Sequence, residues 1–204
     1  MTQRSRPLAA AALAALLAFP ACTTAPPPTR LHSLLPAEPT PRDPAARGAP
    51  LFVALEPIRL PAQVDQPQWL VRLPDESLAS LEQERWASPL RDELRQALLE
   101  QLSARLGIVE GRGAAPPLRV ALELRRFDSV PGREARIDGA WSVLPANASA
   151  TLRCTLLVRE SASGGMAELA AAHRRALVRL AEAIGASVVA VQAGSPSCPI
   201  GEPR

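Results

Sequence analysis

Lysine and tyrosine are absent from this chain of 204 residues, and aromatic, histidine and cysteine residues are few. It contains three Trp, three Phe, two His and three Cys, and all 23 of its basic side chains are Arg. Without lysine the chain has neither a Schiff-base nucleophile nor a phosphate-binding loop of the lysine type. His32, His173 and the scattered cysteines make no zinc pattern, so we expect no metal and no cofactor.

Catalytic motifs are also missing from the sequence. It contains no G-x-S-x-G, no S-x-x-K and no glycine-rich phosphate loop. His173 lies inside an expected helix beside two arginines, where a lone histidine is usually exposed or capped. We therefore predict that the protein is not an enzyme. A periplasmic hydrolase is a distant alternative, because it would need a nucleophile and a base that the sequence does not reveal.

The first 22 residues resemble the export signal of a bacterial lipoprotein. Two arginines precede an apolar run over residues 8–19, which is too short to span a bilayer but has the length of a secretory signal core. Pro20-Ala21-Cys22 follows and is similar to a lipobox. We expect a signal peptide over residues 1–21 and a Cys22 that carries acyl chains such as palmitate. Phe19 stands where lipoboxes usually have Leu, so an ordinary cleavage site is the alternative.

The net charge of the chain depends on this processing. The full sequence has 23 basic and 20 acidic side chains, a formal charge of +3 and a pI near 9.3. Residues 1–21 contain two of the arginines and no acidic residue, so the mature chain has a formal charge of +1. A nearly neutral chain lacks the excess of cations that favours binding to a phosphate backbone. We expect no nucleic-acid partner.

The rest of the chain divides into a proline-rich segment, one domain and a short tail. Prolines are frequent over residues 22–50, where extended conformations predict a semi-rigid tether behind the lipidated N-terminus, with one short strand over 31–35. Residues 51–193 have the length of a single domain. Residues 194–204 are expected to form a flexible tail.

Cys154 and Cys198 are the cysteines that remain for an oxidising compartment. They either form a disulfide that pins the tail to the strand around Cys154, or Cys154 is buried as a small apolar residue and Cys198 is a free thiol. Sequence alone contains no Cα–Cα distance, so both alternatives stay open.

Hydrophobic periodicity predicts two helices. The first follows Ser88 as N-cap and Pro89 as first helical residue, repeats Leu at every fourth position and ends at Gly107. Its polar face is expected in solvent; this face carries Arg91, Arg95, Glu100 and Arg105. The second helix is expected over about 166–190.

Strands are predicted before and between these helices. Residues 51–55 form the first, and a loop shaped by prolines leads to a second short strand near 69–72. Apolar and polar residues alternate over 118–125, 136–143 and 150–159, which is typical of strands with one packed face. The resulting β-α-β-β-β-α order predicts a two-layer α+β domain, with both helices on one face of an antiparallel sheet.

Two proline-containing motifs lie within this pattern. Leu60-Pro61-Ala62-Gln63-Val64-Asp65-Gln66-Pro67-Gln68 precedes the second short strand, and Arg85-Trp86-Ala87-Ser88-Pro89-Leu90 begins the first helix. Asp138-Gly139-Ala140-Trp141 lies in the meander. These stretches resemble the L-P-x-x-x-D-x-P-Q, W-A-x-P-L and G-x-W motifs of the PqiC-like auxiliary lipoproteins of ABC-type, MCE-linked transport systems, over residues 30–190. The chain departs from that family at Val64 and Gln66 and lacks its tyrosines near position 32.

The resemblance implies a docking function rather than catalysis. It suggests a lipoprotein of the outer membrane, facing the periplasm, that docks onto the MCE-domain periplasmic protein of an ABC-type lipid transporter and supports envelope integrity. Family members are similar in forming homo-oligomers. The motif residues that would contact the partner are Asp65, Pro67, Gln68, Trp86, Pro89, Leu90 and Trp141. A lipoprotein that activates or assembles another envelope machine is the alternative.

The same residues also have simpler expected roles in packing. Trp86 precedes the helix N-cap and is placed to act as a hydrophobic staple on the first turn. Pro89 fixes the angle at which the chain enters the helix. Asp65 is suited to accept a hydrogen bond from its own loop. We expect packing to account for these residues more often than direct contact with a partner.

Overall fold

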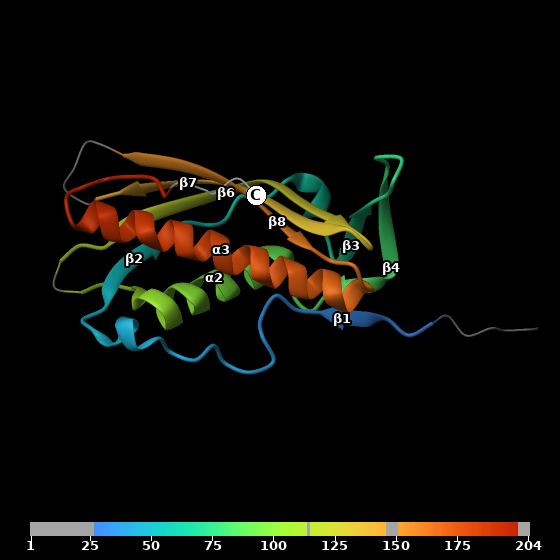
Figure 1. Ribbon diagram of the computed structural model, residues 1–204, viewed down its shortest axis with the longest axis horizontal. Helices are drawn as coiled ribbons and strands as arrows, with labels where there is room; N and C mark the ends of the chain where they lie inside the picture. The colour runs from blue at the N-terminus through green and yellow to red at the C-terminus, as the bar shows by residue number, and fades with distance from the viewer. Residues whose placement is uncertain (1–26, 114, 146–150, 200–204) are drawn as a thin grey trace, which may run out of the picture.

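A layer of strands covered on one face by two α-helices makes up the part of the chain that this computed structural model describes, residues 27–113, 115–145 and 151–199 (Figure 1). The predicted two-layer α+β architecture is confirmed, although the strand order is richer than predicted. The elements in chain order are β1 (Arg30–His32), η2 (Pro44–Arg47), β2 (Leu51–Leu55), η3 (Ala62–Val64), β3 (Gln68–Arg72), β4 (Leu78–Trp86), α2 (Leu90–Leu106), β5 (Ile108–Glu110), β6 (Leu118–Val130), β7 (Glu134–Leu144), β8 (Leu152–Ser161) and α3 (Met166–Gln192).

The larger sheet has five strands in the order β5-β2-β6-β7-β8. The predicted meander is present, because β6, β7 and β8 pair antiparallel. Gly132 makes the tight turn between β6 and β7 with φ of 70°, a conformation that favours glycine. The expectation of a purely antiparallel sheet is wrong, since β2 pairs parallel with both β5 and β6. The chain leaves the sheet after β2 and returns through α2, which places β5 parallel to β2.

A second sheet of three strands, β1-β4-β3, lies at one end of the larger one (Figure 1). We refer to it as the small sheet. β3 and β4 form an antiparallel hairpin, and β1 pairs parallel with the end of β4, where His32 lies opposite Trp86. The sequence pattern did not predict β4, because its residues are mainly Leu, Ser, Glu and Gln without β-branched side chains. Pairing with neighbours on both sides overrides this weak local preference.

The two helices pack closely on the larger sheet. α3 lies against β7 and β8, and α2 lies against α3 and β5. Gly185 permits this approach, because a Cβ there would lie 2.0 Å from Leu106 Cδ1 and 3.4 Å from Ile108 Cδ1. A larger residue at this position would require the Leu106 side chain to move. Among the described residues, neither helix combines the length and the hydropathy needed to cross a bilayer.

The start of α2 differs from the prediction by one residue. The helix begins at Leu90, and Pro89, with ψ of 129°, takes the extended N-cap position that we expected for Ser88. Ser88 Oγ instead donates to Glu93 Oε1 at 2.9 Å. Gly107 ends the helix in the left-handed conformation with φ of 65°, as predicted.

The face of α2 that we expected in solvent is partly covered by other segments. Arg91 Nη1 donates to the Ile58 carbonyl at 2.5 Å, and Arg95 Nη1 donates to the Leu55 carbonyl at 3.0 Å. Both carbonyls belong to the segment that leaves β2. Helical periodicity separates apolar from polar faces, but it does not reveal which polar side chains find partners in distant loops.

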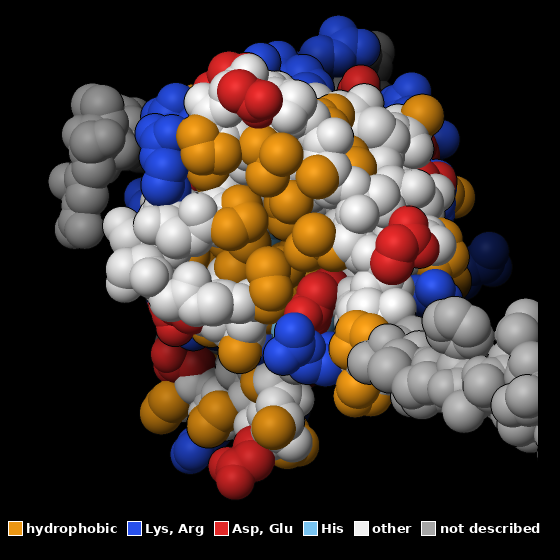
Figure 2. All heavy atoms as spheres, turned by 90° about the vertical axis from the view of Figure 1, so that its right-hand side faces the viewer, with side chains coloured by type: hydrophobic (Ala, Val, Ile, Leu, Met, Phe, Trp, Pro, Cys, Tyr) orange, Lys and Arg blue, Asp and Glu red, His pale blue; other side chains and the backbone are white. Residues whose placement is uncertain are grey.

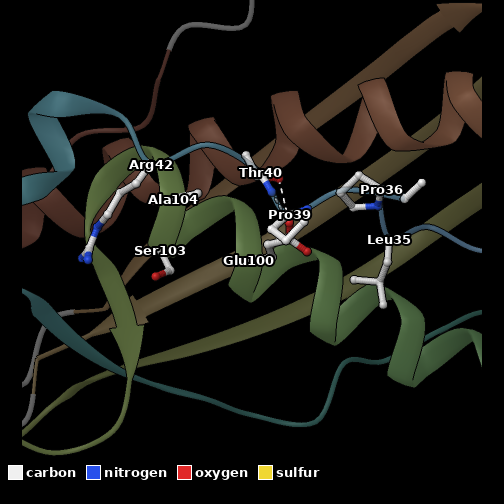
Figure 3. Close-up of a pocket in the computed structure, with 9 residues that line it drawn as sticks. Leu35, Pro36, Pro39, Thr40, Arg42, Glu100, Ser103 and Ala104 are labelled. Atoms are coloured by element: carbon white, nitrogen blue, oxygen red, sulfur yellow. Dashed lines mark hydrogen bonds between the residues drawn. The ribbon is translucent and has the colours of Figure 1, made fainter.

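The proline-rich segment expected as a tether over 22–50 packs against the domain from Arg30 to Arg47. Leu34 is buried in the core, and Thr40 donates to Glu100 Oε1 of α2 through its backbone N at 2.8 Å and its Oγ1 at 2.7 Å. Figure 3 shows this segment running along α2 above a cavity of about 450 Å³ lined by Leu35, Pro36, Ala37, Pro39, Thr40, Arg42, Glu100, Ser103 and Ala104. Prolines here fix an extended path along a helix instead of a free spacer.

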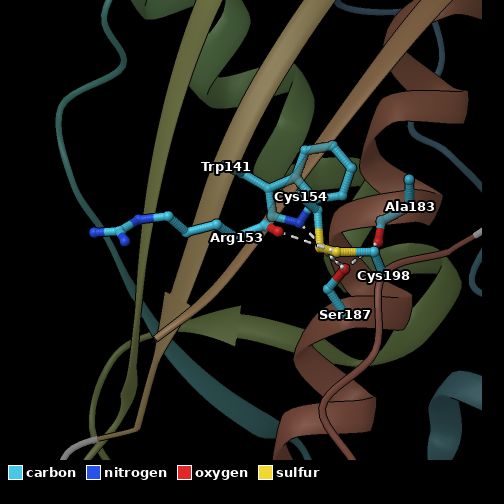
Figure 4. The surroundings of a disulfide bond; sticks show 6 residues. All are labelled: Trp141, Arg153, Cys154, Ala183, Ser187 and Cys198. Carbon is cyan, nitrogen blue, oxygen red and sulfur yellow. Dashed lines mark hydrogen bonds between the residues drawn. A yellow bond between two sulfur atoms is a disulfide. The ribbon is translucent and has the colours of Figure 1, made fainter. Parts of the chain in front are cut away.

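The two chain ends reach beyond the described residues. The expected signal peptide over 1–21, Cys22 and the last tail residues 200–204 lie outside them. The described part of the tail is held to the domain, since Cys154 and Cys198 form a disulfide with a Cα–Cα distance of 5.5 Å. The bond lies between β8 and α3, beside Trp141 and Ser187 (Figure 4). This part of the predicted flexible tail is therefore covalently fixed.

Removal of this disulfide should lower stability. The two cysteines are separated by 44 residues, and opening a loop of that size is expected to reduce the free energy of unfolding of a Cys198→Ser variant by about 2–4 kcal/mol. Urea unfolding with and without reductant measures the effect. Reductant should destabilise the unmodified protein by the same amount and leave the variant unchanged; equal stability of the oxidised and reduced unmodified protein would contradict the prediction.

Candidate functional site

The two proline-containing motifs meet in one cleft beside the small sheet. The cleft has a volume of about 470 Å³ and a mainly apolar lining formed by Asp65, Gln66, Pro67, Arg85, Trp86, Ala87, Ser88, Pro89 and Leu90. Asp65, Gln66 and Pro67 follow η3. The other six residues run from the end of β4 to the first residue of α2. The backbone joins the two walls directly, because Trp86 N–H donates to the Pro67 carbonyl at 3.2 Å. We call this feature the motif cleft.

The wall after η3 is held by an arginine of α2. Arg91 Nη2 donates to Asp65 Oδ2 at 2.6 Å, while its Nη1 binds the Ile58 carbonyl before the motif begins. One guanidinium thus fixes both ends of the loop that contains the L-P-x-x-x-D residues. The expected role of Asp65 as an acceptor for its own loop is replaced by this ion pair. Both side chains are more than a third exposed, so the pair positions the loop more than it stabilises the fold.

The wall between β4 and α2 is connected to the N-terminal segment. Ala87 N–H donates to the His32 carbonyl at 2.7 Å, which continues the parallel pairing of β1 with β4. Pro89 then sets the extended backbone before α2. The strand that enters the fold from the N-terminus therefore touches the motif cleft directly.

A buried carboxylate lies behind this wall. Glu93, 3% exposed, receives hydrogen bonds from Ser88 Oγ at 2.9 Å, Ser33 Oγ at 2.6 Å and the Leu34 backbone N–H at 2.8 Å. A carboxylate removed from water requires such donors, and here all three belong to segments that shape the cleft or lead to it. Glu93 consequently fixes β1 and the W-A-x-P-L segment relative to α2.

An aromatic cluster lies beneath the motif cleft. Trp86 is 5% exposed and stacks against Trp69 of β3 with ring centroids 4.3 Å apart. His32 of β1 meets the edge of Trp69 at 4.8 Å, and Phe127 of β6 lies 5.9 Å from Trp86. His173 of α3 stacks on Phe127 at 4.1 Å. Trp86 is thus part of a core of five rings from five elements, a wider set of contacts than the staple on the first turn of α2 that we expected.

Hydrogen bonds extend this cluster into the centre of the domain. Trp69 Nε1 donates to Ser129 Oγ at 2.7 Å, and Ser129 Oγ lies 2.7 Å from His173 Nε2. Because Ser129 Oγ accepts from Trp69, its hydroxyl hydrogen is free to bind His173 Nε2. The expectation of an exposed or capped His173 is wrong, since this side chain is 0% exposed. Its burial lowers the pKa from 6.5 to about 3.

This serine and histidine pair does not form a hydrolytic site. Ser129 is 1% exposed, so no substrate carbonyl reaches its Oγ, and the lowered pKa makes His173 a poor base at neutral pH. Both side chains are enclosed by the rings of Trp69 and Phe127. The hydrolase alternative therefore finds no support in this pair. Within the described residues, acidic, histidine and cysteine side chains also form no cluster able to hold a metal ion.

The predicted site residues separate into two groups. Asp65, Pro67, Trp86, Pro89 and Leu90 line the motif cleft. Gln68 follows this lining as the first residue of β3. Trp141 lies elsewhere, on β7, where its Nε1 donates to Ser187 Oγ of α3 at 3.1 Å beside the disulfide (Figure 4). Its contacts are those of a core residue, as are those of Cys154.

Sequence reasoning missed several residues that build the cleft. Arg91 and Glu93 follow the W-A-x-P-L residues at the start of a helix, and charges at this position are usually attributed to the helix dipole. No sequence pattern around Arg91 or Glu93 indicates which distant segments they bind. A sequence pattern does indicate the burial of His173, because Leu169 and Leu177 lie four residues before and after it on the buried face of α3.

The fold defines the class of this protein as a two-layer α+β domain with a strand at its N-terminal end and an apolar cleft next to it. The chain belongs to the family of ABC-type transport auxiliary lipoprotein components, whose family model matches residues 32–185. The resemblance inferred from the motifs is thereby confirmed. The family is described as a component of a transport system and not as an enzyme.

Solved structures support the fold. A protein of Xanthomonas campestris from the family DUF330 is 20% identical, with a TM-score of 0.67, and the match covers 82% of this chain and 99% of that one. An uncharacterized protein is 17% identical, with a TM-score of 0.60 and coverage of 67% and 90%. At these identities the likeness concerns the fold alone. A comparison with curated proteins gives no match.

The buried His173 predicts a loss of stability in acid. The unfolded chain binds a proton near pH 6.5, whereas the folded chain binds it only near pH 3, so stability is complete above pH 6.5 and falls as the pH decreases toward 3. Between pH 7.5 and pH 5 this histidine should cost about 2 kcal/mol. Urea unfolding at both pH values checks the difference.

A His173→Gln variant is the control for this measurement, because glutamine does not titrate. The variant is expected to be less stable at pH 7.5 but to lose about 2 kcal/mol less than the unmodified protein on going to pH 5. The same acid sensitivity in both proteins would show that another group carries it.

Proposed function

We propose that this protein is an outer-membrane lipoprotein that serves as the docking subunit of an ABC-type lipid transport system. The observation that carries the proposal is the meeting of both motifs in a single apolar cleft. Membership of the family of transport auxiliary lipoproteins supports it. The partner is the MCE-domain periplasmic protein of the transporter, and the two proteins together maintain the envelope as a barrier.

The proposed anchor is an acylated Cys22. Its chemistry follows from the lipobox-like residues, and Thr23 after it lacks the acidic character of an inner-membrane retention signal. Two or three acyl chains bind a bilayer stably, whereas one binds reversibly. The protein then faces the periplasm from the inner leaflet of the outer membrane, where the transporter's periplasmic component reaches it.

The proposed docking surface is the motif cleft. Its walls are set before any partner arrives, because Pro67 and Pro89 restrict the backbone and Arg91 and Glu93 tie the walls to α2. A surface already in its bound shape pays little conformational entropy on association. The exposed Ala87 and the neighbouring prolines offer an apolar socket with polar groups at its rim, which is the composition typical of a protein-binding hot spot.

The anchor predicts a change in location when its cysteine is removed. Cys22→Ala should release the protein from the membrane fraction into the soluble periplasm and make the envelope more permeable to large hydrophobic compounds, because the acyl chains are the expected attachment. Membrane fractionation and a permeability assay measure both effects. Ala186→Arg, at an exposed alanine of α3, is the control, since it leaves both the anchor and the disulfide in place. Full function of a soluble Cys22→Ala protein would refute the proposal.

The docking surface predicts a loss of partner binding when the cleft is filled. Ala87→Arg places a long charged side chain in the apolar cleft and should reduce capture of the MCE-domain protein about tenfold or more in a pull-down from membranes. The backbone bond from Ala87 to His32 does not depend on the side chain, so the fold should be retained. Ala186→Arg, at an exposed alanine of α3, is the control.

Two results would argue against the cleft as the docking surface. Equal capture by the Ala87→Arg and Ala186→Arg proteins would mean that the partner binds elsewhere. Capture of the components of a different envelope machine, unaffected by the presence of the transporter, would favour the alternative role as an assembly factor.

A further inference from the structure

Exposed apolar side chains concentrate on the small sheet. Among the described residues, five large hydrophobic side chains are exposed, and three of them, Leu31 at 64%, Leu73 at 37% and Leu78 at 45%, belong to β1 and the β3–β4 hairpin. Figure 2 shows hydrophobic side chains gathered on the end of the molecule that carries this sheet. Single exposed leucines are ordinary on a protein surface. A group of them at one end is typical of a surface that contacts a membrane or another protein.

Strand alternation places two of these side chains, Leu31 and Leu78, on one face of the small sheet. Trp69 of β3 points into the aromatic cluster, so its neighbour Leu70, which is partly buried, lies on the opposite face of β3. Leu70 pairs with Ser80, two residues along β4 from Leu78, which therefore shares the outward face. On β1, His32 contacts Trp69, so Leu31 also points away from the core. Leu73 follows β3 at the hairpin turn, where its N–H donates to the Ser77 carbonyl at 2.9 Å; it alternates with the outward-facing set but lies next to Leu78 at the end of the hairpin. We call the outward face, together with Leu73 at the turn, the leucine face.

The position of the N-terminus brings the leucine face near a membrane. Only eight peptide units separate Cys22 from Arg30, the first residue of β1, and a fully extended chain of that length spans at most about 28 Å. Seven residues of β4 separate Arg85, the partner of Leu31, from Leu78, which corresponds to about 23 Å along the strand. The length of the leucine face, about 23 Å, is thus similar to the longest possible distance between Cys22 and Arg30, about 28 Å.

Charges around the face argue for contact through its leucines. Arg30 is paired with Glu84 at 2.5 Å, and Arg72 is paired with Asp128 at 3.1 Å. Asp75 lies in the exposed hairpin turn, where hydrogen bonds from Ser77 lower its pKa and keep it negative. No excess of cations is available there to attract anionic headgroups, so a contact would depend on apolar burial and be insensitive to salt.

We propose that the leucine face rests on the membrane in which the acylated Cys22 is inserted, with Leu31, Leu73 and Leu78 in the interfacial region of the bilayer. The inference rests on the proposed anchor. A tethered surface meets the bilayer at high effective concentration, so a small apolar contact is sufficient to hold it there. The contact fixes the orientation of the domain, and with it the orientation of the motif cleft, relative to the membrane.

Brominated lipids test this contact on the full-length lipidated protein. A Leu78→Trp variant is incorporated into phosphatidylcholine vesicles whose acyl chains carry bromine, which quenches only tryptophan close to the bilayer. The added tryptophan should lose about half of its emission relative to unbrominated vesicles, and high salt should not restore it. The native Trp69, Trp86 and Trp141 are buried and contribute a constant background. Leu73→Trp provides a second probe in the hairpin.

Leu157→Trp is the matched control. Leu157 is 43% exposed, close to the value for Leu78, but it lies on β8 at the other edge of the larger sheet. Its emission should be equal in the two kinds of vesicle. Quenching of Trp at position 157 to the same degree would overturn the proposal, because the domain would then have no fixed orientation.

Flotation separates this proposal from the proposed anchor. Protein that does not float with the vesicles contradicts the anchor and the contact together. Protein that floats without quenching at positions 73 and 78 overturns only the contact. A blue-shifted, unquenched emission at these positions, with a molecular mass that grows with concentration, would assign the leucine face to a second copy of the chain and also overturn it.

Discussion

The stacking of Trp69 on Trp86 is the contact on which the rest of this structure depends. It joins β3 to the last residue of β4, just before α2, and through Phe127 and His173 it joins both strands to the larger sheet and to α3. Aromatic side chains are scarce in this chain, with six in all, and two of its three tryptophans are used here. The motif cleft lies directly above this pair. Its shape is therefore determined by the core and not by a free loop.

The N-terminal strand β1, which follows the proposed anchor in the chain, packs on the same core. β1 brings His32 onto Trp69, and its backbone binds Ala87 at the cleft. Glu93 holds the residues that follow β1, and Arg174 of α3 donates to the Ser33 carbonyl at 3.0 Å. A pull on the chain before Arg30 would be transmitted to the wall of the motif cleft. The first described strand after the proposed anchor and the proposed docking surface are thus parts of one rigid unit.

The extent to which sequence predicted this structure follows from the range of the interactions. The strand Leu51–Leu55, the meander and both helices were predicted because their alternation is a local signal. β4 was missed because its pairing on both sides outweighs the preferences of its own residues. The motifs were recognised, but the bond from Trp86 to Pro67 that makes them one cleft links separate parts of the chain. The prolines predicted a tether because they indicate local stiffness of the chain. They do not indicate that Leu34, in the same segment, is buried in the core.

The correction of the tether changes the geometry that the proposed function requires. A spacer over residues 22–50 would reach about 100 Å, enough to carry a domain far from its membrane. With the chain packed from Arg30 onward, at most about 28 Å of extended chain separates Cys22 from the fold. Under the proposed function, the domain is a base held close to the bilayer, and the partner spans the distance between the two membranes. A rigid cleft beside the strand that follows the proposed anchor suits this arrangement. A domain that binds a long partner needs a fixed orientation more than it needs a long tether.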